Sequence, residues 1–118
     1  MRILLIRLRL IGDVIFTTPA IRAIRRRFPE AHLTYLVEPD AAPVLSGNLH
    51  LDEVVVAEPP DAPRRWLHDL ALARRLRRER FDVAIDFHGG PRSSLLAWAS
   101  GAPRRIGYQI VGRSWMYT

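Results

Sequence analysis

The sequence contains no cysteine and no lysine, and none of its apolar runs is long enough to span a bilayer. Without cysteine there is neither a disulfide framework nor a cysteine metal site, which favours a reducing compartment. Arg2, Arg7 and Arg9 interrupt the first apolar run. That run is therefore neither a transmembrane span, which needs about 20 apolar residues, nor a cleavable signal peptide. These absences predict a soluble, cytoplasmic protein.

The absence of lysine gives every cationic role to arginine, which supplies all 18 basic side chains. A lysine general base, Schiff base or phosphate anchor is therefore excluded. The net charge of +6 suggests anionic partners, such as phosphorylated sugars, nucleic acid or an acidic membrane surface. The alternative is a compositional bias with solvated arginine faces. The four histidines lack ligand spacing, so no metal site is expected.

Strand and helix patterns alternate along the 118 residues, which suffice for one small domain with a core. Apolar runs of strand length predict strands at 2–8, 32–38, 52–58, 81–87 and 104–108. Apolar residues at helical spacing predict helices at 14–28, 62–80 and 91–100, with a helical turn at 41–45. Strands joined by crossovers of this length pair in parallel, so we expect an α/β architecture of three layers.

Two of the predicted helices have one apolar and one basic side. The apolar side of helix 14–28 consists of Val14, Ile21, Ile24 and Phe28, opposite Arg22, Arg25, Arg26 and Arg27. The apolar side of helix 62–80 consists of Trp66, Leu70, Ala73 and Leu76, opposite the arginines of ARRLRRER. Helical spacing of this kind predicts that the apolar sides face the core and the arginines face solvent.

Polar residues follow three of the predicted strands at their carboxyl ends, where parallel sheets bind ligands. They are Gly12 and Asp13 after the first strand, Glu38 and Asp40 after the second, and His88, Gly89, Gly90, Arg92, Ser93 and Ser94 after the fourth. Because the carboxyl ends of parallel strands meet at one edge of the sheet, we expect these residues to converge on one rim.

Asp13 has two interpretations at the expected start of the first helix. Aspartate is a preferred N-cap, because its carboxylate accepts backbone N–H bonds, and a cap is worth about 0.5–2 kcal/mol. As a general base, Asp13 would have to reach a substrate hydroxyl and stay ionised. Gly12 fits both interpretations, since it permits either a sharp turn or the close approach of a ligand.

Pro19 falls inside the same helix, where proline removes a backbone donor. Either the helix kinks there, or it begins with Thr18 as the cap and Pro19 at the first position. In the second case Gly12 to Thr17 form an irregular loop whose backbone N–H groups can cradle an anion. Thr17 and Thr18 therefore join Gly12 as candidate substrate-binding residues.

Three stretches cover nearly the whole chain: MRILLIRLRLIGDVIFTTPAIRAIRRRFPEAHLTYLVEP, DEVV and FDVAIDFHGGPRSSLLAWASGAPRRIGY. In this order they resemble the N-terminal domain of glycosyltransferase family 9, the ADP-heptose:lipopolysaccharide heptosyltransferases. The resemblance implies a GT-B arrangement, in which two Rossmann-like domains face a cleft. Residues 1–118 would be the N-terminal, acceptor-side Rossmann-like domain, itself incomplete, and the C-terminal donor-binding domain would be absent.

The resemblance implies the inverting transfer of heptose from ADP-heptose to the lipopolysaccharide inner core, without cofactor or metal. ADP-heptose would be bound mainly by the absent domain. Asp13, in the GD element, would be the base that deprotonates the acceptor hydroxyl, and this role is compatible with capping. The candidate substrate-binding residues are Gly12, Thr17, Thr18, His88, Gly89, Arg92, Ser93 and Ser94.

The loop before and into the last predicted helix has its own alternatives. Arg92 offers the bidentate geometry that phosphate and carboxylate groups match, and it would contact the acceptor with Ser93 and Ser94. Otherwise the two serines satisfy the first N–H groups of the helix and Arg92 is solvated. Family members carry glutamine where His88 stands, so His88 is expected to form hydrogen bonds rather than to act as an acid or base.

The implied partner is a lipopolysaccharide core acceptor anchored in the inner membrane. The arginines of helix 62–80 would either touch anionic headgroups, as a peripheral contact at the inner face of that membrane, or form an ordinary wet face. Nucleic-acid binding is not expected, because Trp66 is assigned to the core. Without a donor site the 118 residues alone should not transfer sugar. The alternative function is a stand-alone, non-enzymatic α/β module that binds phosphorylated or nucleotide-bearing ligands.

Overall fold

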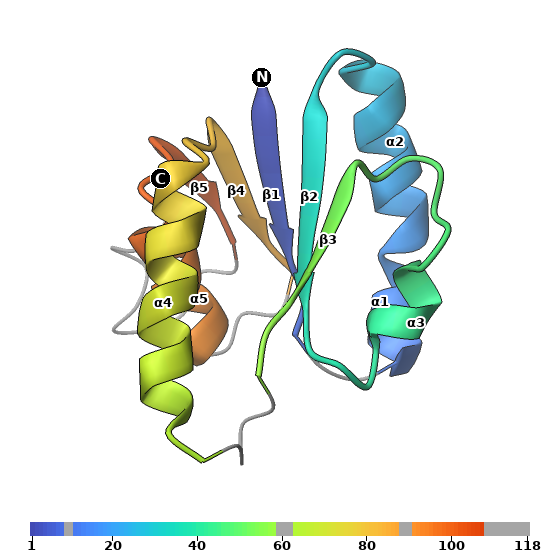
Figure 1. Ribbon diagram of the computed structural model, residues 1–118. Helices are drawn as coiled ribbons and strands as arrows, with labels where there is room; N and C mark the ends of the chain where they lie inside the picture. Colours follow the sequence, from blue (N-terminus) through green and yellow to red (C-terminus); the bar gives the residue numbers. More distant parts are fainter. Residues whose placement is uncertain (9–10, 59–62, 88–90, 108–118) are drawn as a thin grey trace.

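In the computed structural model, the first strand, β1, lies at the centre of a five-stranded parallel sheet (Figure 1). The strands are β1 (Arg2–Ile6), β2 (His32–Val37), β3 (Glu53–Val56), β4 (Val83–Asp86) and β5 (Arg104–Ile106). Their order across the sheet is β3-β2-β1-β4-β5. The structure describes residues 1–8, 11–58, 63–87 and 91–107, and of Ile11 and Asp13 the backbone only.

Helices cover both faces of this sheet, as the alternating pattern predicted. One face carries α1 (Ile11–Phe16), α2 (Thr18–Arg27) and α3 (Ala42–Leu45). The other carries α4 (Arg65–Arg78) and α5 (Pro91–Ala99). Figure 1 shows the three layers, with α4 and α5 side by side on one side of the sheet. The predicted parallel α/β architecture is confirmed.

Alternate residues of β1 enter two separate cores. Ile3 and Leu5 pack in the cluster beneath α1, α2 and α3, whereas Leu4 and Ile6 pack in the cluster beneath α4 and α5. All four are at most 2% exposed. A strand covered on both faces needs apolar residues at successive positions, and this is why RILLI is apolar almost throughout.

The predicted helix over 14–28 is divided at Thr17 into α1 and α2. Pro19 has no N–H for the carbonyl of Ile15, four residues earlier, and the Thr18 hydroxyl donates to that oxygen at 2.7 Å instead. A helix therefore begins beside Pro19, as one alternative predicted, but one residue early, with Thr17 as the N-cap and Thr18 as its first residue. The irregular loop that the same alternative expected from Gly12 is wrong, since these residues form α1.

Asp13 is the third residue of α1, because the helix begins two residues earlier than the sequence predicted. The expectation that Asp13 is the N-cap is therefore wrong. An aspartate in the first turn is still favoured by the helix dipole, so the position remains a suitable one for a carboxylate.

α4 is rotated relative to the predicted orientation. Leu76 is fully buried as expected, but Trp66 and Leu70 are exposed, so their assignment to the core is wrong. Leu72, which packs against the core, and Asp69, which pairs with Arg92 of α5, lie on the inward side of α4 instead. The exposure of the arginines in the second half of α4 is confirmed.

Arg25 was expected in solvent, but it is half-buried and joins two loops. Its guanidinium donates to the Asp52 carboxylate at 2.7 Å and to three backbone carbonyls, those of Pro29, Ala31 and His50. The Leu33 N–H, and after it the Arg25 guanidinium, hold the pKa of Asp52 below its ordinary value. One side chain therefore fixes the entrances of both β2 and β3.

We expect Arg25→Lys to lower the free energy of unfolding by about 1–3 kcal/mol, because an ammonium cannot reach several acceptors from one planar fork. Urea denaturation measures this loss. Arg26→Lys, at an exposed position in the same turn of α2, is the matched control and should stay within about 0.5 kcal/mol of the parent. Equal effects of the two substitutions would contradict the role assigned to Arg25.

Candidate functional site

β1 and β4 are neighbours, yet the chain leaves them toward opposite faces of the sheet. Ile6 at the end of β1 pairs with Asp86 at the end of β4. From β1 the chain continues into α1 on one face, and from β4 it continues into α5 on the other (Figure 1). Open α/β sheets bind ligands in the crevice at such a switch point. The structure thus places the GD element and the start of α5 on either side of this switch point, where the fold predicts a ligand crevice.

Several predicted site residues lie outside what the structure describes. These are the side chain of Asp13 and the whole of His88 and Gly89, together with Gly90 of the predicted rim. The described backbone puts Asp13 in the first turn of the helix that leaves β1. The roles assigned to these residues stay predictions.

Gly12 is exposed on α1 and has a helical backbone. A Cβ atom at this position would meet nothing within 4 Å. The interpretation of Gly12 as the residue of a sharp turn is therefore wrong, and packing does not require a glycine there either. Close approach of a ligand to the α1 backbone is the interpretation that stands.

Polar groups lie buried beneath α1, where the sequence predicted only apolar core. The Thr17 hydroxyl donates to the Val14 carbonyl at 2.6 Å, so the Tyr35 hydroxyl donates to Thr17, at 2.9 Å. Burial raises the pKa of Tyr35 to about 12, although the charge of Arg7 acts in the opposite direction. Tyr35 is therefore a neutral donor at physiological pH.

The hydroxyls of Thr17 and Thr18 both stabilise the break between α1 and α2. Their predicted contact with substrate stays a prediction. Arg7 was not predicted as part of the site, but its guanidinium donates to the Phe87 carbonyl at 2.9 Å and so joins the ends of β1 and β4. A basic residue at the end of an apolar strand was the signal in the sequence.

α1 also presents two apolar side chains to solvent at this edge, which the sequence analysis did not predict. Ile15 and Phe16 are both exposed, immediately after the segment that contains Gly12 and Asp13. Val14, between Asp13 and Ile15, is fully buried and anchors the helix to the sheet. The edge therefore combines a carboxylate-bearing turn with an exposed apolar surface, of the kind on which a sugar ring can pack.

Arg92 is the centre of an ion-pair cluster that joins β2, α4 and α5. Its Nε and Nη2 donate to the two carboxylate oxygens of Asp69, at 2.9 and 2.6 Å, and its Nη1 donates to Glu38 at 2.7 Å. The side chains of Arg92 and Glu38 are only 15% and 7% exposed. Arg92 thus forms bidentate hydrogen bonds, as predicted, but they bind a carboxylate of this same chain, that of Asp69.

The alternative in which Arg92 is solvated is wrong, since its side chain is only 15% exposed. Arg92 supplies the positive charge that the largely buried carboxylates of Glu38 and Asp69 need. Ser93 and Ser94 are fully buried, and the Ser93 hydroxyl donates to Asp86 at 3.1 Å. Ser93 thus ties the first turn of α5 to the end of β4. Direct contact of Arg92 and the serines with an acceptor stays a prediction.

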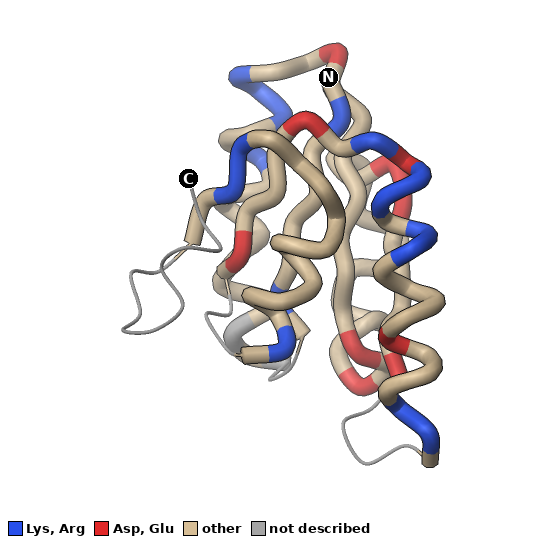
Figure 2. Tube along the Cα trace, turned by 90° about the vertical axis from the view of Figure 1, so that its left-hand side faces the viewer, with Lys and Arg blue, Asp and Glu red and all other residues tan. Residues whose placement is uncertain are grey.

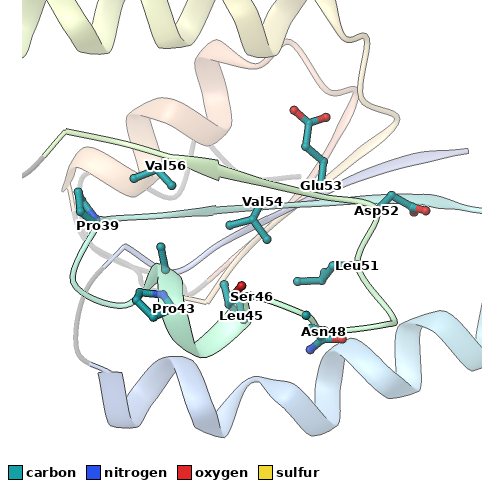
Figure 3. Close-up of a pocket in the computed structure, with 12 residues that line it drawn as sticks. Pro39, Pro43, Leu45, Ser46, Asn48, Leu51, Asp52, Glu53, Val54 and Val56 are labelled. Atoms are coloured by element: carbon teal, nitrogen blue, oxygen red, sulfur yellow. The ribbon is translucent and has the colours of Figure 1, made fainter.

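A hollow of about 590 Å³ lies away from this crevice, beside the edge strand β3 (Figure 3). α3, the loop after it and β3 form its walls, and Leu45, Leu51 and Val54 line its floor. Its two acids are already paired, Asp52 with Arg25 and Glu53 with Arg75. None of the predicted site residues lines this hollow.

In the described part of the chain, no group of His, Cys, Asp or Glu side chains could hold a metal ion. In the same residues no helix has the length and apolar character to cross a bilayer. The positioned groups around the crevice are therefore a helix turn with a carboxylate, hydroxyls and guanidinium groups.

A profile of glycosyltransferase family 9 (heptosyltransferase) matches residues 70–118. The crystal structure of a family 9 glycosyl transferase from Veillonella parvula has the same fold, with a TM-score of 0.82 and 29% sequence identity. This similarity covers 91% of the present chain and 32% of the other. The chain is therefore similar to glycosyltransferase family 9, in the sequence of its C-terminal part and in its fold.

Two heptosyltransferases are also similar to this chain. Lipopolysaccharide core heptosyltransferase OpsX of Haemophilus influenzae is 24% identical over 104 residues, which are 88% of this chain and 29% of OpsX. E. coli heptosyltransferase WaaC, solved with ADP-2-deoxy-2-fluoro heptose, shares the fold with a TM-score of 0.82 at 21% identity. That likeness covers 100% of this chain and 41% of WaaC. The chain thus spans between 29% and 41% of the length of these relatives.

We expect Arg92→Gln to destabilise the protein by about 3–5 kcal/mol, because it removes the guanidinium that pairs with the buried Glu38 carboxylate. Chemical denaturation at neutral pH measures the change. Arg75→Gln removes an arginine from the more exposed pair with Glu53 and is the matched control, with an expected cost below about 1 kcal/mol. A cost for Arg92→Gln no larger than that of the control would contradict a structural role for the cluster.

Proposed function

We propose that this chain is the acceptor-binding part of an inverting glycosyltransferase that transfers heptose from ADP-heptose to the inner core of lipopolysaccharide. The observation that carries the proposal is the position of Asp13, in the first turn of the helix that leaves β1 beside the switch point. Similarity to family 9 and to the heptosyltransferases OpsX and WaaC supports the choice of donor and acceptor.

In the proposed reaction the Asp13 carboxylate takes the proton of an acceptor hydroxyl. The acceptor oxygen then forms a bond to the anomeric carbon of the heptose, while the bond from that carbon to the diphosphate oxygen breaks. ADP departs with the electron pair, and attack from the opposite face inverts the anomeric configuration. The reaction needs no metal or cofactor in this chain, and the donor would be held by a second domain across the cleft.

Other groups at the crevice have supporting roles in the proposal. Gly12 would let the acceptor approach the α1 backbone, and His88 and Gly89 would complete the opposite wall. Arg92, held by Glu38 and Asp69, would position the start of α5 and with it the preceding loop. Because a lipopolysaccharide acceptor is anchored in a membrane, the protein would work as a peripheral protein at the cytoplasmic face of the inner membrane.

Asp13→Asn tests the chemistry in a polypeptide that joins residues 1–118 to a family 9 donor-binding domain. We expect the turnover number, measured as ADP release, to fall by about 10²–10⁴ with a small change in KM for the acceptor, because the base is lost and the shape is kept. Glu30→Gln, at an exposed site before β2 and so at the opposite edge of the sheet, removes the same charge and should leave turnover unchanged. Undiminished turnover of the Asp13 variant would remove this residue from the mechanism.

Gly12→Ala separates ligand contact from folding. We expect the free energy of unfolding to stay the same or to rise by up to about 1 kcal/mol, since alanine favours a helix and has open space here. The KM for the acceptor should rise. Gly47→Ala should give the reverse pattern, with lower stability and an unchanged KM, because Gly47 has a φ of +80° and lies far along the chain in the α3–β3 loop. A Gly12 variant with unchanged acceptor kinetics would contradict the close-approach interpretation.

A further inference from the structure

The outer face of α4 combines exposed apolar residues with arginines. Trp66, Leu67 and Leu70 are 68%, 40% and 48% exposed, which is unusual for side chains of this size on one helix. Steps of three and four residues place side chains on the same face of a helix, so this apolar group continues toward its C-terminus into further side chains. These are Arg74, Arg77 and Arg78, all exposed.

No acidic residue interrupts this face. The single acid of α4 is Asp69, which is turned toward α5 and bound by Arg92. Figure 2 shows α4 with basic positions over its C-terminal half and at its first turn, separated by largely uncharged positions. The exposed face of α4 is therefore apolar at one end, basic at the other and without negative charge.

α5 extends the apolar part of this surface. It lies beside α4 on the same side of the sheet (Figure 1), and Leu95 and Trp98 are 51% and 44% exposed. We give the name α4/α5 face to the large apolar residues and the arginines that form this exposed surface on the two helices. They are Trp66, Leu67, Leu70, Arg74, Arg77, Arg78, Leu95 and Trp98.

α4 runs antiparallel to the strands, which places the apolar part of the α4/α5 face near the ligand-binding edge. Near its start, Asp69 belongs to the cluster that includes Glu38, immediately after β2. In its last turn, Arg75 pairs with Glu53 at the start of β3. Trp66 and Leu67 therefore lie at the same edge of the sheet as α1 and the switch point.

We propose that the α4/α5 face docks on an anionic lipid bilayer. Its tryptophan and leucine side chains would insert at the boundary between headgroups and acyl chains, and its arginines would bind the lipid phosphates. Tryptophan and leucine on one part of a helix and arginine on the remainder are the composition that binds at a membrane interface. The guanidinium group also matches phosphate geometry. This inference rests on the proposed function in one respect, namely that a membrane-anchored acceptor would enter the site at this edge.

Charge argues against a second copy of this chain as the occupant. Self-association through the α4/α5 face would bring the arginines of one copy close to those of the other, with no carboxylate on that face of α4 to offset the repulsion. A phosphate-rich bilayer supplies the complementary charge. It also offers an apolar layer beneath the phosphates, which a purely polar anion lacks.

Binding of the 118-residue chain to phosphatidylcholine vesicles, with and without phosphatidylglycerol, tests the proposal. We expect co-sedimentation with the anionic vesicles that weakens as salt is added, and little with the neutral ones. No sugar, donor or acceptor is present, so failure here leaves the proposed transfer reaction unaffected, and an inactive enzyme would leave the vesicle result unaffected.

Two pairs of variants locate the contact. The double variant Arg74→Gln/Arg78→Gln should weaken vesicle binding by roughly 25-fold, about fivefold for each arginine. Its control is Arg22→Gln/Arg26→Gln on α2, which removes the same charge from the other side of the sheet. This control should change binding only slightly. Leu70→Ala should weaken binding by about tenfold. Leu49→Ala, at an even more exposed leucine in the α3–β3 loop, should not.

Three results would each overturn the proposal. They are no binding to anionic vesicles at low salt, equal losses in the α4 and control variants, and equal binding to neutral vesicles, which would indicate unspecific adsorption. Sedimentation equilibrium provides a fourth: a dimer that Leu70→Ala dissociates would assign the α4/α5 face to a second copy. Because all substituted side chains are exposed, circular dichroism should show that each variant keeps the parent fold.

Discussion

Burial of β1 on both faces is the constraint from which the rest of the arrangement follows. Because its alternate residues fill two different cores, β1 must have strands on both sides and helices above and below. β2 and β3 then occupy one side of it and β4 and β5 the other. The chain consequently leaves β1 and β4 in opposite directions, and the crevice between them is where the candidate catalytic turn lies.

Arginine serves two purposes in a chain that has no lysine. Arg25 and Arg92 are half-buried, and each uses its planar fork to bind several oxygens that would otherwise face the interior without a partner. The arginines in the second half of α4 do the reverse, since they extend into solvent with few partners on their own face. The same side chain thus organises the loops around the sheet and supplies the positive charge of the surface.

The sequence predicted the order and type of nearly all elements, because strands buried on both faces and amphipathic helices have distinct apolar periods. It also predicted the break at Pro19 as one of two alternatives. The predicted face of α4 was correct at Leu76 but wrong at Trp66 and Leu70. Asp69 lies on the inward side in their place, because it pairs with Arg92 of α5. Long-range pairs of this kind have no signal in the local sequence.

By itself, the sequence determined that this chain is a parallel α/β protein that resembles glycosyltransferase family 9 and has a GD element after its first strand, because hydrophobic period and local motif are properties of neighbouring residues. Tertiary structure alone decided which charges are paired and which surface stays open. Glu38, Asp69 and Arg92 are separated by tens of residues and meet only when β2, α4 and α5 are packed. That packing buries one arginine among carboxylates and turns Trp66 outward, since a helix can present only one of its faces to the sheet.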